Sequence, residues 1–366
     1  MADNNLYLAV GEEAARGTAE TSAVAFIPLL NAGIPSFEAD DKKRAEYRGE
    51  DTVKGATTMI RMSRKWGATL DIPFFTQSLA STQNLMGTMI KHFFGKGTST
   101  QNGATGQYYH MYYPVVDPFA TGSGLVAGKA LTLNMNVNEG ATQKNWPFVG
   151  GRVKALGFEQ EAGNHLKMSA EMFGQFRDTV GSAIASPSFP AENLRCDYNN
   201  MKLYTGTITR TGTGPDFTNY TFGSATQIKP DKVSLKLENG MEDALRLSGL
   251  DYADKTRMGV FKATLEITLD WEDPASGFSS ADDFNLWIAS ASTTNFFLHW
   301  DTGTQAGTGD NHQLYIDLPV MQRMGGEPDY SLEKDPMVTL KYEALYDATT
   351  AKYLCGILLK DAAAAT

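Results

Sequence analysis

The residue types that carry most catalytic and metal chemistry are few in this chain. It has five histidines and two cysteines, and none of them lies at the spacing of a metal site or of a nucleophile with its base. Cys196 and Cys355 are therefore expected to be buried free thiols. The Gly-Ser-Gly at 122–124 lacks the full frame of a nucleophile elbow, and the aspartate pair at 282–283 is of a kind that is usually solvated. The sequence predicts no enzyme, no metal and no cofactor.

One charged run lies between residues 38 and 65, where both signs are mixed over a segment with little strand-like alternation. One interpretation is an exposed, solvated loop. The other is an arm that pairs with complementary charges on a neighbouring subunit, because such complementarity selects a partner and fixes its register. The candidate interface residues in this run are Asp40, Asp41, Lys42, Lys43, Arg44 and Arg48.

The whole chain of 366 residues carries a net charge of −10. Proteins that grip nucleic acid by its phosphates need a basic face, so this composition disfavours that class. It is compatible with a surface past which DNA slides without sticking, although many soluble proteins carry similar charge for solubility alone. The first residues lack the features of a secretory signal, and no run of about 18 apolar residues predicts a membrane helix.

Most of the sequence has the pattern of short β-strands, which would position these residues. Apolar and polar residues alternate with period two in 129–137, 233–238 and 263–269, which is typical of strands with one buried face. Asn239-Gly240 directly follows the second of these segments and favours the positive dihedral angles of a tight hairpin turn. We therefore expect a mainly β protein.

Two helices are predicted, each with one apolar stripe that would pack on a sheet. The first covers residues 81–94, and its stripe consists of Met86, Met89, Ile90, Phe93 and Phe94. The second follows Ser280, a candidate N-cap with two aspartates in the first turn. Its stripe consists of Phe284, Trp287, Ile288 and Ala291.

The chain also contains an internal repeat in sequence order. Segment 68–74 parallels 263–269, and each is followed by a predicted helix, an aromatic pair, a polar glycine-containing loop and further strands. The alternative is two unrelated stretches with a generic α+β pattern. The repeat predicts a first unit at 1–155, connecting strands with a Pro/Ser-rich linker at 156–227, and a second unit at 228–366.

Several segments, taken in order, resemble a known family. The opening Gly-Glu-Glu-Ala-Ala-Arg-Gly-Thr-Ala at 11–19, followed by Ala-Phe-Ile-Pro-Leu at 25–29, is similar to the start of siphophage-type tail tube proteins. The resemblance continues through Val-Gly-Gly-Arg-Val-Lys-Ala-Leu at 149–156 with the strand at 166–171, the strand at 233–239, and the closing pattern at 314–319 and 338–347. It spans nearly the whole chain. Each motif alone is weak, and their order carries the likeness to tail tube proteins of long-tailed bacteriophages.

The resemblance implies tandem β-sandwich or barrel units, each with a flanking α-helix, an architecture shared with type VI secretion tubes. Such proteins stack as rings around a channel, and a duplicated chain would build a pseudo-hexameric ring from three copies. The implied partners are further copies, a tape-measure protein, tail-tip and terminator proteins, and DNA passing through the lumen, but no membrane. The implied location is the virion tail, after assembly in the host cytoplasm. The charged run at 38–65 would stack the rings, and Glu238 and Glu266 are candidates for an acidic lumen.

Two other interpretations remain open. A β-sandwich that binds or cleaves glycans would use exposed Trp and Tyr for stacking and a pair of acids for hydrolysis. It predicts a soluble monomer that a glycan stabilises. An outer-membrane barrel is disfavoured by the missing signal and by the two apolar-faced helices.

Overall fold

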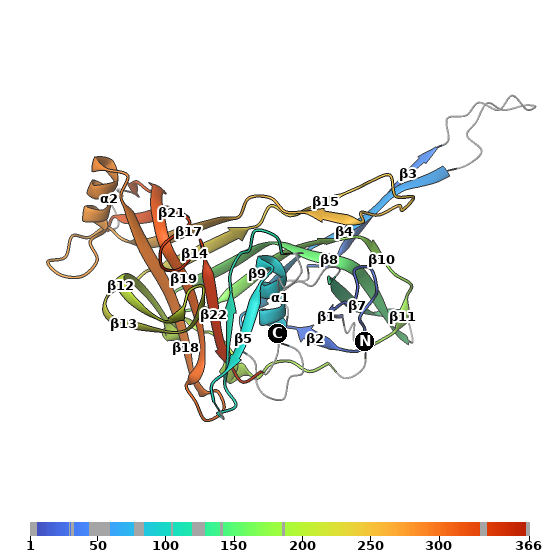
Figure 1. Cartoon of the computed structure of the whole chain (residues 1–366), viewed down its shortest axis with the longest axis horizontal. Helices are drawn as coiled ribbons and strands as arrows, with labels where there is room; N and C mark the ends of the chain where they lie inside the picture. Colours follow the sequence, from blue (N-terminus) through green and yellow to red (C-terminus); the bar gives the residue numbers. More distant parts are fainter. Residues whose placement is uncertain are drawn as a thin grey trace, which may run out of the picture.

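A computed structural model gives the fold of the chain (Figure 1), and the residues it describes are 6–28, 30, 33–43, 59–76, 84–103, 105–118, 129–139, 142–184, 187–329 and 335–363. Within these residues there are 22 strands, two α-helices and two short 3-10 helices, at Glu192–Leu194 and Tyr198–Asn200. Twenty of the strands belong to one sheet with antiparallel pairings. The prediction of a mainly β protein is confirmed.

Seven strands form the centre of the sheet, in the order β3, β4, β9, β8, β14, β17 and β21. Their bounds are β3 Ser36–Lys43, β4 Met59–Pro73, β9 Lys167–Gly174, β8 Thr142–Glu161, β14 Lys232–Glu238, β17 Lys262–Asp270 and β21 Met337–Ala344. Strands β3 and β4 extend beyond the rest of the sheet as a two-stranded projection (Figure 1). The sheet runs without a break through all three segments that the repeat had delimited.

The long strand β8 belongs to two parts of the sheet. Its second half pairs with β9 and β14, whereas its first half pairs with β7 and with the short strands β10 and β11. Strands β1 and β2 continue the sheet beyond β7. The partners change near Gly150, whose φ of 71° is a conformation that glycine adopts at little cost. The bounds are β1 Tyr7–Glu12, β2 Val24–Ile27, β7 Leu131–Glu139, β10 Phe176–Arg177 and β11 Gly181–Ser182.

The other end of the sheet is curled, in the order β5, β6, β22, β19, β18, β12 and β13. The curl brings β13 close to β5 and β6, where the Asp216 carboxylate accepts hydrogen bonds from Thr98 (2.9 Å) and Tyr113 (3.1 Å). A cluster rich in aromatic side chains fills the inside of the curl. The bounds are β5 Gly97–Gln101, β6 Tyr108–Tyr112, β22 Gly356–Asp361, β19 Asn311–Gly325, β18 Thr293–Gln305, β12 Met201–Thr213 and β13 Asp216–Ile228.

Helix α1 (Leu85–Phe94) lies in the main core, packed against β8, β6 and β2. The Asn84 side chain caps its first turn by accepting a hydrogen bond from the Gly87 N–H, and Gly95 ends it in the left-handed conformation. The whole predicted stripe is buried, so this helix is confirmed from Leu85 onward. The predicted residues 81–83 lie outside the described residues.

The predicted alternation holds in β14 and β17, where every second side chain is buried. It fails in part for β7, where the polar face is buried as well. Much of that face is hydrogen-bonded: Thr132 Oγ1 donates to Glu13, Asn145 Nδ2 donates to Asn134, and the Asn136 side-chain oxygen accepts from the Ile184 N–H. The Asn136 Nδ2 group is buried without a partner among the described residues. Period two located the strand correctly, but a polar residue can face a protein interior when partners are present.

Asn239-Gly240 was predicted to form a tight hairpin and does not. Gly240 has a φ of 60°, as the pattern required. However, the chain then leaves the sheet for a small two-stranded excursion, β15 (Glu242–Ala244) and β16 (Lys255–Arg257), before it returns as β17. Asn239 is buried and donates to the Phe93 and Val153 carbonyls, so its amide anchors the departure point of the excursion to the core.

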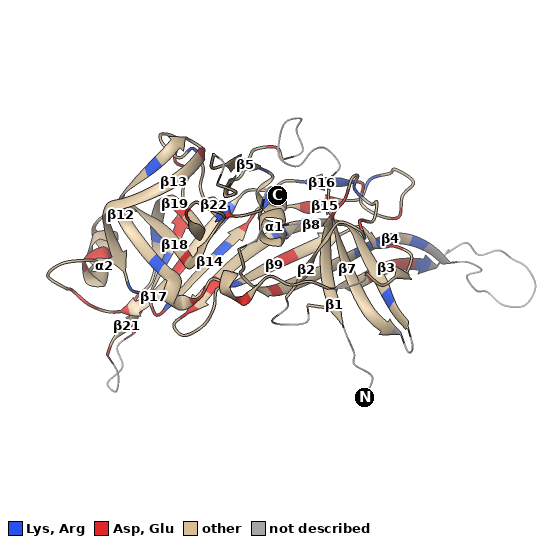
Figure 2. Cartoon of the chain, turned by 90° about the horizontal axis from the view of Figure 1, so that it is seen from below, with Lys and Arg blue, Asp and Glu red and all other residues tan. Residues whose placement is uncertain are grey.

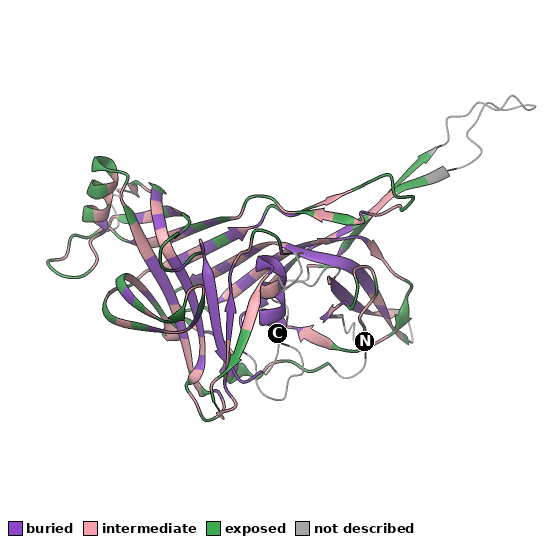
Figure 3. Ribbon diagram, in the orientation of Figure 1, coloured by how far each residue is buried: buried purple, intermediate pink, exposed green. Residues whose placement is uncertain are grey.

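Helix α2 (Ser280–Ala289) differs most from its prediction. Its N-cap is Ser279, whose side chain accepts from the Asp282 N–H, because the Ser280 hydroxyl is used by the backbone of residues 270–272. Phe284 and Trp287 are half-buried, but Ile288 is 65% exposed and Ala291 lies beyond the helix. Figure 3 contrasts the buried α1 with the largely exposed α2. The predicted core packing is therefore correct for α1 and wrong for the outer side of α2.

The two halves share an order of elements: β4, α1, β5 and β6 in the first, β17, α2, β18 and β19 in the second. Their pairings differ, since β4 pairs with β3 and β9 whereas β17 pairs with β14 and β21. The aromatic pair at 93–94 ends a helix, and the pair at 296–297 lies in β18. The tips of the β5–β6 and β18–β19 hairpins meet, with Gln107 donating to the Asp310 carbonyl at 3.0 Å.

Candidate functional site

One face of the central strands of the sheet is solvated, and we call it the polar sheet face. It comprises the outward residues of β9, the second half of β8, β14, β17 and β21, with Thr69 and Asp71 of β4. Each of these strands alternates buried apolar residues with outward polar ones, so the other face supplies the core. Many outward residues are short: Gly157, Ser169, Ser234, Thr264, Thr268 and Thr339.

The charged residues of this face nearly balance. Its lysines are Lys154, Lys167, Lys232, Lys236, Lys262 and Lys341, and its acids are Asp71, Glu159, Glu161, Glu171, Glu238, Glu266, Asp270 and Glu343. Six lysines and eight acids leave a net charge of −2. Figure 2 shows acidic and basic residues interspersed along the strands. A surface of this kind offers no basic patch that would hold phosphate groups.

Most of these charges meet a neighbour of opposite sign. Glu159 lies 2.8 Å from Lys167 on β9 and 2.5 Å from Lys232 on β14, so its carboxylate bridges three strands. Hydrogen bonds from these two lysines lower the pKa of Glu159. Lys154 and Glu171 are 2.6 Å apart. Because such pairs are solvent-exposed, each contributes only about 0–1 kcal/mol to stability; their effect is to neutralise the surface.

The two sequence-predicted lumen residues both lie on the polar sheet face. Glu238 is 2.6 Å from Lys236 of its own strand, and Glu266 is 3.1 Å from Lys341 on β21. Their side chains remain about half-exposed. The expected acidic surface is therefore nearly neutral in this structure, because Lys236 on the same strand and Lys341, which the register places opposite Glu266, offset the two carboxylates.

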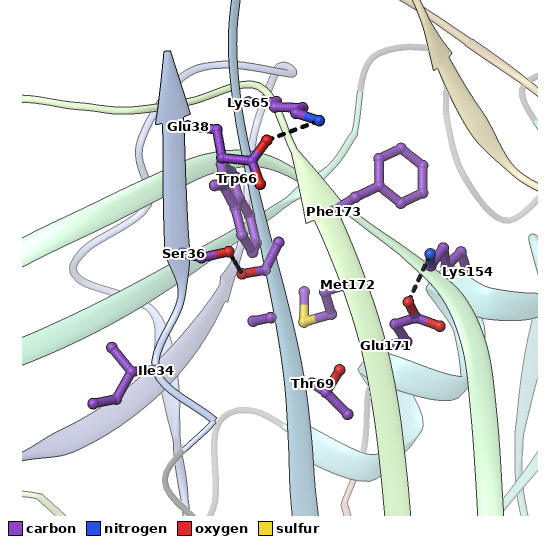
Figure 4. A pocket seen from close by; sticks show the side chains of 12 residues that line it. Ile34, Ser36, Glu38, Lys65, Trp66, Thr69, Lys154, Glu171, Met172 and Phe173 are labelled. Atoms are coloured by element: carbon purple, nitrogen blue, oxygen red, sulfur yellow. Dashed lines mark hydrogen bonds and ion pairs between the residues drawn. The ribbon is translucent and has the colours of Figure 1, made fainter.

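Two shallow grooves mark the polar sheet face. One, of about 330 Å³, crosses β4, β9, β8 and β14. The other, of about 380 Å³, lies where the projecting strands leave the sheet. In Figure 4 the charged side chains of this second groove point at one another, Lys65 at Glu38 and Lys154 at Glu171. The grooves are lined by groups already paired, which suits a passive surface better than a reactive site.

The projecting ends of β3 and β4 form what we call the arm. Asp41 on β3 and Arg61 on β4 join through two hydrogen bonds of 2.8 and 3.1 Å, which lower the pKa of the Asp41 carboxyl. Lys65 and Glu38 are 2.9 Å apart. The sequence showed little strand-like alternation between residues 38 and 65. Both ends of this run nevertheless lie in paired strands, because ion pairs between β3 and β4 take the place of the usual apolar alternation.

The candidate interface residues can now be placed. Asp40, Asp41 and Lys42 lie on β3, with Asp40 and Lys42 3.8 Å apart and both exposed. Lys43 ends β3, and its side chain lies outside the described residues. Arg44 and Arg48 lie outside them entirely. The described part of the arm therefore keeps most of its charged groups exposed at a distance from the core.

The arm is fastened to the β15–β16 excursion. Arg64 on β4 forms a 2.6 Å ion pair with Asp251, and its N–H donates to the Asp251 carbonyl. Its guanidinium also lies over the rings of Phe176 and Tyr252, at 4.8 and 5.7 Å from their centroids. The arm and the excursion thus project together.

A buried cluster around Glu13 brings together two of the segments that carry the family likeness. The Glu13 carboxylate accepts hydrogen bonds of 2.7 Å from the Gly17 and Gly150 N–H groups. Arg16 binds the Gly150 carbonyl and forms a 2.7 Å ion pair with Asp243 of β15. Burial raises the pKa of Glu13. The segments at 11–19 and 149–153 therefore meet in space and anchor the excursion.

One arrangement that sequence reasoning missed resembles a nucleophile–base–acid row. Ser99 lies 2.7 Å from Nδ1 of His110, whose Nε2 lies 3.0 Å from Asp361. Asp361 also accepts from Asn84 at the start of α1 and from the Ala363 N–H. Acyl transfer further needs a cleft and oxyanion donors beside the hydroxyl, whereas Ser99 and His110 face each other as cross-strand neighbours. The row fastens the C-terminal strand to α1.

The described residues contain no cluster of three or more His, Cys, Asp or Glu side chains that could hold a metal ion. Within the same residues, neither helix combines the length and the apolar character needed to cross a bilayer. Cys196 and Cys355 are both buried and unpaired, as expected. Burial raises the pKa of both thiols.

Comparison with known proteins gives no assignment. No family model matches the sequence. No curated protein matches it significantly. The argument for a function therefore rests on the polar sheet face and the arm.

Proposed function

We propose that this chain is a structural protein whose copies stack as rings into a tube, of the kind that forms the tail tube of long-tailed bacteriophages. In this proposal the chain has no catalytic role. The tube is a conduit for DNA, and the chain belongs to the virion tail after assembly in the host cytoplasm. A tape-measure protein, tail-tip and terminator proteins are its further partners.

The observation that carries the proposal is the polar sheet face. A channel for DNA needs a continuous wall that is wetted but does not bind phosphate. Five neighbouring strands provide such a wall here, with short side chains and with charges paired to each other at distances such as 2.5 Å for Glu159 and Lys232. Its net charge of −2, from six lysines and eight acids, weakly repels a polyanion such as DNA and offers it no binding site.

The arm supports the stacking half of the proposal. A two-stranded hairpin without a core of its own is only marginally stable in water, so a long exposed one is best explained by a partner that covers it. The exposed charges of Asp40 and Lys42 suit an electrostatically complementary contact with the next ring. Among the described residues β3 pairs with β4 alone, so its outer edge is available for such a contact.

The ring in this proposal is a trimer with pseudo-six-fold symmetry. Its basis is the repeated order of strand, helix and hairpin in the two halves of the chain. Contacts between unlike surfaces close a ring by rotation, and contacts between rings extend it into an open tube.

The test is a charge reversal on the arm. Lys42→Glu with Lys43→Glu reverses two charges on β3, where the Lys42 side chain is exposed, and folding and the thermal midpoint should be unchanged. Tube growth, measured by negative-stain electron microscopy and pelleting, should fall at least tenfold. The matched control is Lys202→Glu with Lys229→Glu, two lysines on the body, which should assemble like the parent chain. Normal tubes from the arm variant would refute the stacking role of the arm.

A further inference from the structure

The inside of the curl holds a lysine that is almost completely buried. Lys360 lies on β22, and its side chain is only 2% exposed. Its Nζ atom lies over two rings of the aromatic cluster, 5.2 Å from the centroid of Tyr109 and 5.4 Å from that of Tyr315. Burial lowers the pKa of Lys360. A desolvated lysine gives up its proton more readily, and the neutral amine is the nucleophilic form.

An asparagine side chain faces this amine from the opposite wall of the curl. Asn219 lies on β13, which is separated from β22 along the sheet by β19, β18 and β12. The Lys360 Nζ atom donates to Oδ1 of Asn219 at 2.8 Å. Because a C=O bond is about 1.23 Å long, Nζ lies within about 4.0 Å of the amide carbon Cγ. Reacting atoms in near-attack conformations are about 3–3.5 Å apart, so a small shift brings the amine into range.

A carboxylate lies beside the same amine. Asp310, at the tip of the β18–β19 hairpin, is 3.1 Å from Nζ of Lys360. The buried Gln107 side chain holds the Asp310 backbone, because it donates to the Asp310 carbonyl at 3.0 Å and accepts from the Asp310 N–H at 3.2 Å. The carboxylate is 53% exposed, so this side of the arrangement opens to water. A carboxylate fixed in this position is able to take a proton from the amine and pass it on.

We propose that Lys360 and Asn219 join in an isopeptide bond within the chain, with Asp310 as the group that transfers protons. The Asp310 carboxylate takes a proton from the Lys360 ammonium group, and the neutral amine attacks Cγ of Asn219. The Nζ–Cγ bond forms and the Cγ–Nδ2 bond breaks. Both protons that Nζ loses pass through Asp310 to Nδ2, which leaves as ammonium and restores the carboxylate. The reaction needs no oxidant, reductant or second substrate.

The bond crosses the inside of the curl and joins positions 141 apart in the sequence. Within the described part of the chain, β13 pairs only with β12, so its other edge has no strand to hold it. A covalent link between distant positions restricts the unfolded chain, as a disulfide does. The isopeptide bond therefore keeps the curl closed. It concerns a single chain and holds whether or not copies stack into a tube.

The test is peptide mapping of the purified full chain by mass spectrometry. Trypsin cleaves after lysine and arginine except before proline, so the unmodified chain gives peptides 211–232 and 353–360. The isopeptide bond blocks cleavage after Lys360. Peptide 211–232 should then appear joined to 353–366 in at least half of the chains, with a mass about 17 Da below the sum of the two, because one ammonia is lost.

Two variants and a control assign the roles. Lys360→Met keeps an apolar stem among the aromatic rings and removes the amine, so the joined peptide should be absent. Asp310→Asn keeps the size of the side chain and removes the proton acceptor, so the joined fraction after a fixed time should fall at least tenfold. The control, Lys202→Met, removes an exposed lysine of β12 in the same curl and should leave the joined fraction unchanged. Circular dichroism checks that each variant folds.

Two results would overturn the proposal. One is complete cleavage after Lys360 in the parent chain, even after prolonged incubation. The other is a loss of about 17 Da together with normal cleavage after Lys360, because ammonia would then have left a different amide. An undiminished joined fraction in Asp310→Asn would overturn the part assigned to Asp310.

Discussion

Removing one partner of a buried ion pair should reveal how the curled end of the sheet is held. Arg210 on β12 and Asp317 on β19 are joined by two hydrogen bonds of 2.7 Å each. The Tyr353 hydroxyl donates to the same carboxylate at 2.6 Å. The Asp317 side chain is only 1% exposed, so water cannot replace a missing partner. Arg210→Met keeps an unbranched apolar stem, removes the guanidinium group and leaves this carboxylate buried without its cation.

The expected cost follows from that burial. An unpaired buried charge costs about 3–5 kcal/mol, which is a large part of the roughly 5–15 kcal/mol that stabilises a typical domain. With a urea slope of about 3 kcal/mol per M, a loss of about 3 kcal/mol lowers the unfolding midpoint by about 1 M. The measurement is urea unfolding followed by tryptophan fluorescence and circular dichroism.

Two further variants make this prediction sharp. Arg210→Met combined with Asp317→Leu removes both charges, so most of the lost stability should return, with a coupling energy of about 2–3 kcal/mol. The control pair is Arg246 and Asp254, also joined at 2.6 Å but with 52% of the arginine side chain exposed. Arg246→Met should cost less than about 1 kcal/mol. An Arg210→Met variant as stable as the control, or a double variant no better than the single, would refute the reasoning.

Other predictions concern acid, thiols and the polar sheet face. Burial lowers the pKa of His92 to about 4 in the folded chain, compared with about 6.5 when it is unfolded. As the pH falls, the unfolded state therefore binds the proton first. The free energy of unfolding should fall by about 3 kcal/mol between pH 6.5 and pH 4. His92→Gln should flatten that fall in chemical unfolding curves, and an unchanged pH slope would contradict the assignment. Cys196 and Cys355 should react with a thiol reagent only after unfolding, and rapid labelling of the native chain would show that they are accessible. Glu238→Lys with Glu266→Lys changes the net charge of the polar sheet face from −2 to +2, a change of four charge units. Short duplex DNA should then bind the variant at low salt and dissociate at high salt. If parent and variant bind DNA equally weakly, charge is not the reason that DNA fails to bind the parent.

The features that sequence patterning predicted are those set by local periodicity. The stripe of α1 and the alternation of β14 and β17 place the same side chains in the core that the structure buries. A core-facing pattern with period 3.6 or 2 has few alternatives when the segment is long and strongly apolar. The positive φ of Gly240 was likewise predicted from the Asn-Gly pair and is found in the structure.

The features that escaped prediction depend on partners distant in sequence. The polar face of β7 is buried because Glu13, directly after β1, and Asn145 of β8 reach it. Ile288 is 65% exposed, which no periodicity within the helix reports. The Ser99–His110–Asp361 row joins residues 251 positions apart at its longer step. Lys341 beside Glu266 could have been found only by fixing the register of β17 against β21, whereas Lys236 is two positions from Glu238 on one strand and was within reach of the sequence.

Electron cryo-microscopy of the purified chain, concentrated until it assembles, bears on the whole proposal. We expect stacked rings of three chains each, with an open channel lined by the outward residues of β9, β8, β14, β17 and β21. A tube whose channel is lined by other strands, or a chain that remains monomeric at every concentration, would contradict the proposal.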